Sequence, residues 1–191
     1  TQNFESSIGG DKSLSIRPME RIIEPLTLMG ANIKSNNNKA PLIFKPPKVL
    51  KVIKYSSNIP SAQVKSCIML ASLFIPGTSI IRETIQTRDH TEQILKYLEY
   101  PVEIKNNEII ISGQKELLAK DIFIPSDISS ASFFIVAALI KESSNITLKN
   151  IGINPLRTGI IDVLIEMGAD IKILNKSFKK MAENLKIILI N

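Results

Sequence analysis

Two short polar segments carry the side chains in this sequence that are best suited to hold an anion. The first is Ser61-Ala62-Gln63, which follows Pro60 at the start of a predicted helix. Serine is a favoured N-cap, and the backbone N–H groups that follow it have no partners within the helix. The Ser61 hydroxyl and the Ala62 amide could hold a phosphate, with Gln63 donating to a second group. A plain capped helix start has the same pattern, so this segment alone leaves both interpretations open.

The second polar segment is Thr87-Arg88-Asp89-His90-Thr91-Glu92, which leads into another predicted helix. Arg88 is the best single candidate for a phosphate or carboxylate contact, because its planar guanidinium can bind two oxygens at once. Asp89 and Glu92 have the spacing of a capping box. A surface loop before a capped helix would explain the same residues. His90 could act as an acid–base group, although a polar structural role is the simpler interpretation.

The remaining reactive side chains point to structural roles. Asp127 opens a further predicted helix, where it could cap the helix or orient a basic group, and Arg157 repeats the position of Arg88. Cys67 is the only cysteine and lies in an apolar helical stripe, so we expect it in the core and not as a nucleophile. His90 is the only histidine, which excludes a two-histidine metal site. We therefore expect a site without metal or other cofactor, in a reducing compartment.

The elements that must position these residues follow a repeating order. Helical spacing predicts helices over residues 18–29, 62–74, 89–97, 129–140 and 158–167. Short β-rich runs predict strands over residues 31–34, 42–44, 49–55, 78–82, 102–105, 108–112, 121–124, 145–148, 171–174 and 185–190. Residues 35–39 are expected as a polar loop, and Asn106-Asn107 is a hairpin turn signal. The order strand–helix–strand–helix–strand–strand thus occurs twice.

Matching residues support a true repeat. Ile59-Pro60-Ser61 matches Ile124-Pro125-Ser126, and the run over 29–34 matches the run over 167–172 almost letter for letter. We therefore predict one partial lobe with units over residues 1–47, itself incomplete, 48–116 and 117–191. Helices that are apolar on several faces should pack inward, which predicts an α/β fold with buried helices and outer sheets. A start in the middle of a unit predicts a partial product.

Composition narrows the class of partner. The formal net charge of +6 suits anionic partners, which could be phosphorylated metabolites, nucleic acid or an acidic surface. Aromatic residues make up 5% of the chain and are not clustered with Lys or Arg, which disfavours nucleic-acid binding by stacking. No apolar run reaches the roughly 18 residues that a membrane span needs. The first residues have no basic stretch before an apolar one, as a signal peptide would.

Five ordered motifs give the sequence a family resemblance. They are Gly10-Asp11-Lys12-Ser13-Leu14-Ser15-Ile16-Arg17-Pro18-Met19, Ser61-Ala62-Gln63-Val64-Lys65-Ser66, Thr87-Arg88-Asp89-His90-Thr91-Glu92, Asp127-Ile128-Ser129-Ser130-Ala131 and Arg157-Thr158-Gly159-Ile160-Ile161-Asp162-Val163. The set resembles the 5-enolpyruvylshikimate-3-phosphate synthase (3-phosphoshikimate 1-carboxyvinyltransferase) family, in its bacterial Ser-Ala-Gln form. The resemblance covers nearly the whole chain and implies the inverse α/β lobe of enolpyruvyl transferases, made of such repeat units.

The resemblance implies an activity and its partners. The family moves the enolpyruvyl group of phosphoenolpyruvate to the 5-hydroxyl of shikimate 3-phosphate and releases phosphate, in aromatic amino acid and chorismate biosynthesis, without metal. By resemblance, Ser61, Ala62 and Gln63 bind the shikimate phosphate and its surroundings, Gln63 also reaches the enolpyruvyl side, and Arg88 contacts the phosphate region. The expected setting is a cytoplasmic monomer that binds neither nucleic acid nor membrane.

Several family segments have no match in this chain, and two alternatives remain. The amino-terminal Lys-Ser…Arg segment, the Asn-Ser-Gly-Thr…Arg segment, the carboxy-terminal acidic base and the arginines that grip phosphoenolpyruvate are absent. We therefore expect a central fragment that is inactive alone, with no catalytic residue assigned, and Ser126 replaces the usual Gly. One alternative is the sibling UDP-N-acetylglucosamine enolpyruvyl transferase, which the runs over 88–92 and 127–131 disfavour. The other is a basic nucleic-acid-binding module.

Overall fold

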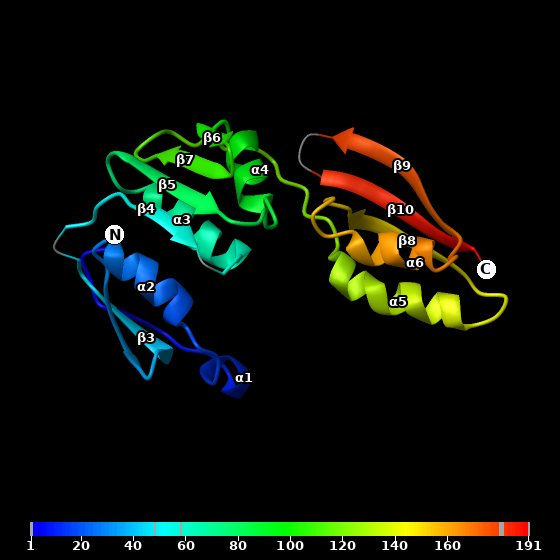
Figure 1. Cartoon of the computed structure of the whole chain (residues 1–191), viewed down its shortest axis with the longest axis horizontal. Coiled ribbons are helices and arrows are strands. Elements are labelled where there is room, and N and C mark those ends of the chain that lie inside the picture. The colour runs from blue at the N-terminus through cyan, green and yellow to red at the C-terminus, as the bar shows by residue number, and fades with distance from the viewer. Residues whose placement is uncertain (1, 48, 58, 180–181, 191) are drawn as a thin grey trace. The chain divides into compact units, whose positions relative to one another are not determined.

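A computed structural model describes residues 2–47, 49–57, 59–179 and 182–190 of the chain, with side chains described as far as residue 174. The chain divides into two compact units, unit 1 over Thr1–Leu118 and unit 2 over Ala119–Asn191. Both units combine helices with sheets, as the predicted fold class requires (Figure 1). Within the described ranges, no helix is both long enough and apolar enough to span a bilayer.

Unit 1 contains two sheets and the segments that carry Ser61 and Arg88. Its strands are β1 (Ser6–Ile8), β2 (Asn32–Asn36), β3 (Lys39–Lys45), β4 (Lys54–Ser57), β5 (Thr78–Glu83), β6 (Val102–Lys105) and β7 (Glu108–Ser112). Its helices are α1 (Lys12–Ser15), α2 (Glu20–Leu28), α3 (Ala62–Ser72) and α4 (His90–Tyr97). One sheet has the order β1-β3-β2 and the other β4-β5-β7-β6. Strands β4 and β5 run parallel, whereas β5, β7 and β6 pair antiparallel.

The main core of unit 1 lies between the sheet β4-β5-β7-β6 and helices α3 and α4 (Figure 1). Burial alternates along β7, so that Ile109 and Ile111 face the core, as the two-residue period of a strand dictates. Ile68 and Met69 of α3 and Leu95 of α4 belong to the same buried cluster. This packing fixes the starts of both helices relative to the sheet.

The sheet of unit 2 repeats the pairing order of the four-stranded sheet of unit 1, with one strand fewer among the described residues. Its elements are α5 (Ile128–Ile140), β8 (Asn145–Gly152), α6 (Gly159–Glu166), β9 (Ile171–Lys179) and β10 (Ala182–Ile190). The sheet order β8-β10-β9 corresponds to β5-β7-β6 of unit 1, and all its pairs are antiparallel. A single parallel bridge between Ser126 and Ile151 stands where unit 1 has β4. The repeat boundaries at 47/48 and 116/117 stay predictions.

The strand predicted over residues 49–55 begins only at Lys54, so the prediction is wrong for residues 49–53. Parallel pairing with β5 begins at Lys54, opposite Ile80. The apolar residues that suggested a strand, Leu50, Val52 and Ile53, instead pack against the unit 1 core from an irregular segment. Hydrophobic pattern alone does not distinguish these two ways of burying a short run.

The strand predicted over residues 121–124 is also wrong. Ile122 and Ile124 are exposed, and pairing starts only at Ser126, after Pro125. The Ser126 amide donates to Asn150 O at 2.8 Å, and the Gly152 amide donates to Ser126 O at 2.9 Å. Proline has no N–H to give to a ladder, which explains why pairing is confined to the residue that follows it.

The polar loop predicted over residues 35–39 is a tight hairpin turn. Asn37 and Asn38 have φ of 49° and 54°, and β2 and β3 pair right up to Asn36 opposite Lys39. Asparagine tolerates this left-handed conformation better than most residues, because its short side chain bonds locally. The hairpin turn predicted at Asn106-Asn107 is confirmed, with φ of 49° and 62°.

We predict that Gly113→Ala destabilises unit 1, because the added Cβ would lie 1.8 Å from Ile75 O and 2.4 Å from Ser72 O. The backbone would have to shift, at a cost of about 1–3 kcal/mol or more in the free energy of unfolding. Gly9→Ala is the matched control, since its Cβ would have Pro41 Cβ as nearest neighbour at 4.0 Å. Urea unfolding followed by circular dichroism measures both, and equal stability of the two variants would contradict the packing.

Candidate functional site

The two polar segments singled out in the sequence leave neighbouring strands at the same edge of a sheet. Strands β4 and β5 run parallel, with Ser57 opposite Glu83 at their carboxyl ends. The chain after β4 leads to Ser61 and α3, and the chain after β5 leads to Arg88 and α4. In open α/β sheets, ligands bind beyond the carboxyl ends of the parallel strands. The topology thus places both predicted binding segments at the edge where such a site is expected.

Ser61 is the N-cap of α3, as predicted. Its backbone is extended, with φ of −150° and ψ of 110°, and its Oγ accepts from the Val64 amide at 3.4 Å. That separation is long for a hydrogen bond, so the hydroxyl is only loosely held. Ser61 and Ala62 are half-buried, whereas Gln63 is exposed. The first amides of a helix have no partner within it, and α3 therefore offers N–H donors at this edge.

Arg88 is exposed and lies in the loop between β5 and α4. Within the described part of the chain, its guanidinium has no hydrogen-bond or ion-pair partner. A guanidinium that is fully charged at neutral pH and not used in the fold is available to a ligand. The guanidinium of Arg88 is therefore exposed and free to bind an anion.

The capping box predicted for Asp89 and Glu92 is wrong. Asp89 is the N-cap residue of α4 but makes no side-chain capping bond, and its Oδ2 accepts from Gln93 Nε2 at 2.8 Å. Glu92 turns inward and is 2% exposed, because Lys65 of α3 provides a cation there. Glu92 therefore pairs with Lys65 of another helix and does not cap α4.

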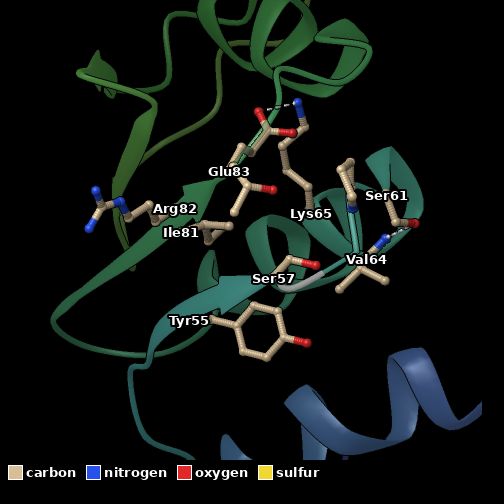
Figure 2. Close-up of a pocket in the computed structure, with 10 residues that line it drawn as sticks. Tyr55, Ser57, Ser61, Val64, Lys65, Ile81, Arg82 and Glu83 are labelled. Carbon is tan, nitrogen blue, oxygen red and sulfur yellow. Dashed lines mark hydrogen bonds and ion pairs between the residues drawn. The ribbon is translucent and has the colours of Figure 1, made fainter.

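A largely buried group of three charged residues, Lys65, Glu83 and Glu92, joins α3, β5 and α4. Figure 2 shows Lys65 and Glu83 of this group. Lys65 Nζ lies 3.0 Å from Glu83 Oε2 and 2.7 Å from Glu92 Oε1, and it also donates to Thr87 O at 3.4 Å. Glu83 Oε1 accepts from both the amide and the hydroxyl of Thr87. Ser66 and Thr91 add a hydroxyl bond of 2.6 Å between α3 and α4.

A small open pocket lies beside this group, bounded by the ends of β4 and β5 and the start of α3 (Figure 2). Its lining residues include Tyr55, Ser57, Ser61, Lys65 and Glu83. Of the four predicted site residues, Ser61 lines this pocket, whereas Ala62, Gln63 and Arg88 lie outside its lining. The candidate site thus consists of an edge with a helix start, a pocket beside it and a neighbouring loop.

The Tyr55 hydroxyl belongs to the wall of this pocket. Burial raises its pKa above the ordinary value, and the nearby carboxylate of Glu24 raises it further. Tyr55 therefore remains protonated at neutral pH and can donate a hydrogen bond. Within the described ranges, no cluster of His, Cys, Asp and Glu is arranged to hold a metal ion.

Unit 2 shows what an arginine at the Arg88 position can reach. Arg157 precedes α6 as Arg88 precedes α4, and its Nη2 lies 2.9 Å from Oδ1 of Asp127, the N-cap residue of α5. The same guanidinium donates to Ser129 Oγ, in the first turn of α5. The two roles considered for Asp127, capping and orienting a basic group, are both confirmed.

The model of one protein family, EPSP synthase (3-phosphoshikimate 1-carboxyvinyltransferase), matches residues 1–191. The chain belongs to the EPSP synthase family. A curated 3-phosphoshikimate 1-carboxyvinyltransferase of Vesicomyosocius okutanii is 51% identical over 175 residues, and one of Endomicrobium trichonymphae is 49% identical over 174 residues. These alignments cover 92% and 91% of this chain and 40% of each relative.

The solved EPSP synthase structures confirm the fold class. A structure of EPSP synthase from Acinetobacter baumannii is 42% identical and superposes with a TM-score of 0.84. The match covers 99% of this chain and 43% of that one. The chain thus has the fold predicted for a lobe of this family, and it spans about 40% of the length of the curated relatives it matches.

Lys65 and Glu83 are site residues that the sequence alone did not identify. The available signal was position: Lys65 shares the buried face of α3 with Val64, Ile68 and Met69. A lysine is almost never fully buried unless it is paired, so a lysine on an apolar face predicts a buried carboxylate. The partner itself could not be named, because Glu83 lies 18 residues away and reaches Lys65 only in the folded unit.

We predict that Lys65→Met strongly destabilises unit 1. Removal of the cation leaves the buried Glu92 without its counter-ion and takes one partner from the largely buried Glu83, which costs about 3–5 kcal/mol in the free energy of unfolding. Lys96→Met, on the exposed surface of α4, is the control and should change stability by less than about 0.5 kcal/mol. Chemical unfolding of both variants tests this, and a Lys65→Met protein as stable as the control would disprove the ion pairing.

We also predict that Cys67 reacts slowly with iodoacetamide at pH 7. Burial raises the pKa of its thiol, so the reactive thiolate is scarcer than in an exposed cysteine. The rate should rise as the pH rises towards and through that raised pKa. Mass spectrometry of the native chain against the urea-unfolded chain provides the measurement. A native rate equal to the unfolded rate would show that Cys67 is not shielded.

Proposed function

We propose that this chain is part of a 3-phosphoshikimate 1-carboxyvinyltransferase, an enzyme that transfers the enolpyruvyl group of phosphoenolpyruvate to the 5-hydroxyl of shikimate 3-phosphate and releases phosphate. Within it, Ser61, Ala62, Gln63 and Arg88 bind shikimate 3-phosphate. Family membership supports the reaction, and the geometry of the β4–β5 edge supports the residues.

One observation carries the assignment of the residues. The helix start capped by Ser61, whose first amides have no partner within the helix, and the loop that carries the unpaired Arg88 follow neighbouring parallel strands at the same edge. A helix start attracts a phosphate through free N–H groups and a positive dipole end. An arginine beside it can bind two phosphate oxygens at once, which neither a lysine nor a hydroxyl can do. Gln63, exposed on the first turn of α3, can donate to a neighbouring hydroxyl or carboxylate of the same ligand.

The internal repeat gives independent support. In unit 2 the guanidinium of Arg157 reaches the N-cap residue of α5 and is neutralised there by the Asp127 carboxylate. In unit 1 the N-cap residue is Ser61, which has no charge, and Arg88 is left without a counter-ion among the described residues. We interpret the Asp127 carboxylate as occupying in unit 2 the place that a ligand phosphate takes in unit 1.

The remaining parts of the proposal follow from the family. Phosphoenolpyruvate is the second substrate, no cofactor is needed, and the reaction proceeds by addition followed by elimination of phosphate. A cytoplasmic location and a monomeric state are the corresponding predictions for the protein that contains this segment. Neither nucleic acid nor membrane is expected as a partner.

We predict that the 191-residue chain binds shikimate 3-phosphate with a dissociation constant on the order of 1 mM, equivalent to about −4 kcal/mol. An NMR titration at low ionic strength should shift the amides of residues 61–63 and the side-chain N–H of Arg88. Plain shikimate should bind far more weakly, because it lacks the phosphate. Arg88→Ala should abolish the shifts, whereas Arg21→Ala, which removes another exposed arginine, from α2, should leave them.

Two further ligands test the alternatives. UDP-N-acetylglucosamine bound at residues 61–63 in preference to shikimate 3-phosphate would favour the sibling transferase. A single-stranded oligonucleotide that shifts basic residues across the surface, with strong salt dependence, would favour a nucleic-acid-binding module. Equal shifts from shikimate and its 3-phosphate would contradict the phosphate site itself.

A further inference from the structure

The buried position of Lys65 is not explained by stability alone. Its side chain is 2% exposed and faces two carboxylates, so one cation is shared between two anions. Glu92 Oε2 is buried and has no hydrogen-bond partner among the described residues. Such an arrangement is often no more stable than apolar packing of the same volume, but it can fix one geometry. The question is therefore which geometry this group fixes.

Lys65 is the residue that bonds to both binding segments. Lys65 belongs to α3, one helical turn after Ser61, and its amide makes the helix bond to Ser61 O at 3.1 Å. Its ammonium donates to Thr87 O at 3.4 Å. Thr87 directly precedes Arg88 in the chain. One side chain thus joins the helix start that carries Ser61 to the loop that carries Arg88.

The carboxylates of Glu83 and Glu92 also hold the loop between β5 and α4, one at each end of it. Glu83, at the end of β5, accepts from the Thr87 amide at 3.1 Å and also from the Thr87 hydroxyl. Glu92, in the first turn of α4, ties the far end of the loop to Lys65 at 2.7 Å. The backbone on both sides of Arg88 is therefore held by buried bonds, while the Arg88 side chain itself stays exposed and unpaired within the described part of the chain.

We infer that Lys65, Glu83 and Glu92 are positioning residues that hold Arg88 at a fixed place relative to the start of α3, so that both can bind one phosphate. The inference rests on the proposed function, because it assumes that Arg88 and residues 61–63 share a ligand. A fixed loop removes the conformational entropy that a mobile arginine would lose on binding, and preorganisation of this kind strengthens binding without adding a contact. None of the three residues needs to touch the ligand.

The test separates loop position from overall stability. Thr87→Val removes one hydroxyl that bonds to Glu83 and leaves the charged group complete. Thr78→Val is its matched control, because Thr78 makes a hydroxyl bond of 2.9 Å to Ser112 at the other end of β5. Glu92→Gln keeps the oxygen that accepts from Lys65, and Lys65→Met breaks the group. For each variant we would measure the melting temperature, amide exchange of residues 87 and 88, and the dissociation constant for shikimate 3-phosphate.

Thr87→Val should weaken binding about 2- to 10-fold, as expected for the loss of one hydrogen bond. It should also speed amide exchange at residues 87 and 88 while the core amides of β7 stay protected. Thr78→Val, the control, should bind within about twofold of the unmodified chain. Glu92→Gln, which replaces the ion pair with Lys65 by a neutral hydrogen bond, should weaken binding, but less than Lys65→Met does. Lys65→Met, where it folds, should bind at least about tenfold more weakly. If Lys65→Met does not fold, Thr87→Val and its control decide the question.

The outcomes distinguish this inference from the proposed function. If the unmodified chain shows no binding that depends on Arg88, the proposed site is wrong and the positioning role falls with it. A second outcome is that the unmodified chain binds through Arg88, but Thr87→Val has the same affinity and the same amide exchange rates at residues 87 and 88 as the unmodified chain. In that case the proposed site is supported and the positioning role is overturned. If Thr78→Val weakens binding as much as Thr87→Val, the effect is one of general stability, which also overturns it.

Discussion

The parallel pairing of β4 with β5 determines where the chemistry of unit 1 can lie. Two neighbouring strands that run in the same direction release their following segments at the same edge, so the start of α3 and the loop before α4 must emerge together. An antiparallel pair would have sent them to opposite ends of the sheet. The pocket, the buried lysine and the exposed arginine all depend on this single register, in which Ser57 lies opposite Glu83.

The two units share one arrangement of helices and strands, but its arginine has a different role in each. Each has a helix start beside an arginine that precedes the next helix, but unit 2 closes the arrangement with the carboxylate of Asp127. Arg157 therefore forms an ion pair within the chain, and this pair neutralises its charge. In unit 1 the interactions that fix the loop are moved inward to Lys65, Glu83 and Glu92, which leaves Arg88 outside the fold's own bonding.

Local chemistry explains what the sequence could predict. The cap at Ser61, the Asn106-Asn107 turn and the β6–β7 hairpin depend on residues within a few positions of one another, and each is found where the pattern places it. The errors arise where distant residues compete for the same group. Glu92 has the spacing of a cap partner, yet its carboxylate pairs with Lys65 across two elements, a contact that no local pattern contains. The apolar run before Lys54 packs against the core without strand pairing, because burial does not require pairing. The run before Ser126 contains the exposed Ile122 and Ile124, so an apolar pattern there predicts neither burial nor a strand.

The exposed donors at the β4–β5 edge have a practical consequence for any measurement on this chain. A helix start and an unpaired guanidinium attract small oxyanions in general, and not phosphate esters alone. Sulfate or phosphate in a buffer would therefore compete for the place beside Ser61 and Arg88, and an apparent affinity would fall as the concentration of the salt rises. Sulfate-rich crystals would be expected to hold an ion there, whose oxygens would mark the geometry that the phosphate adopts.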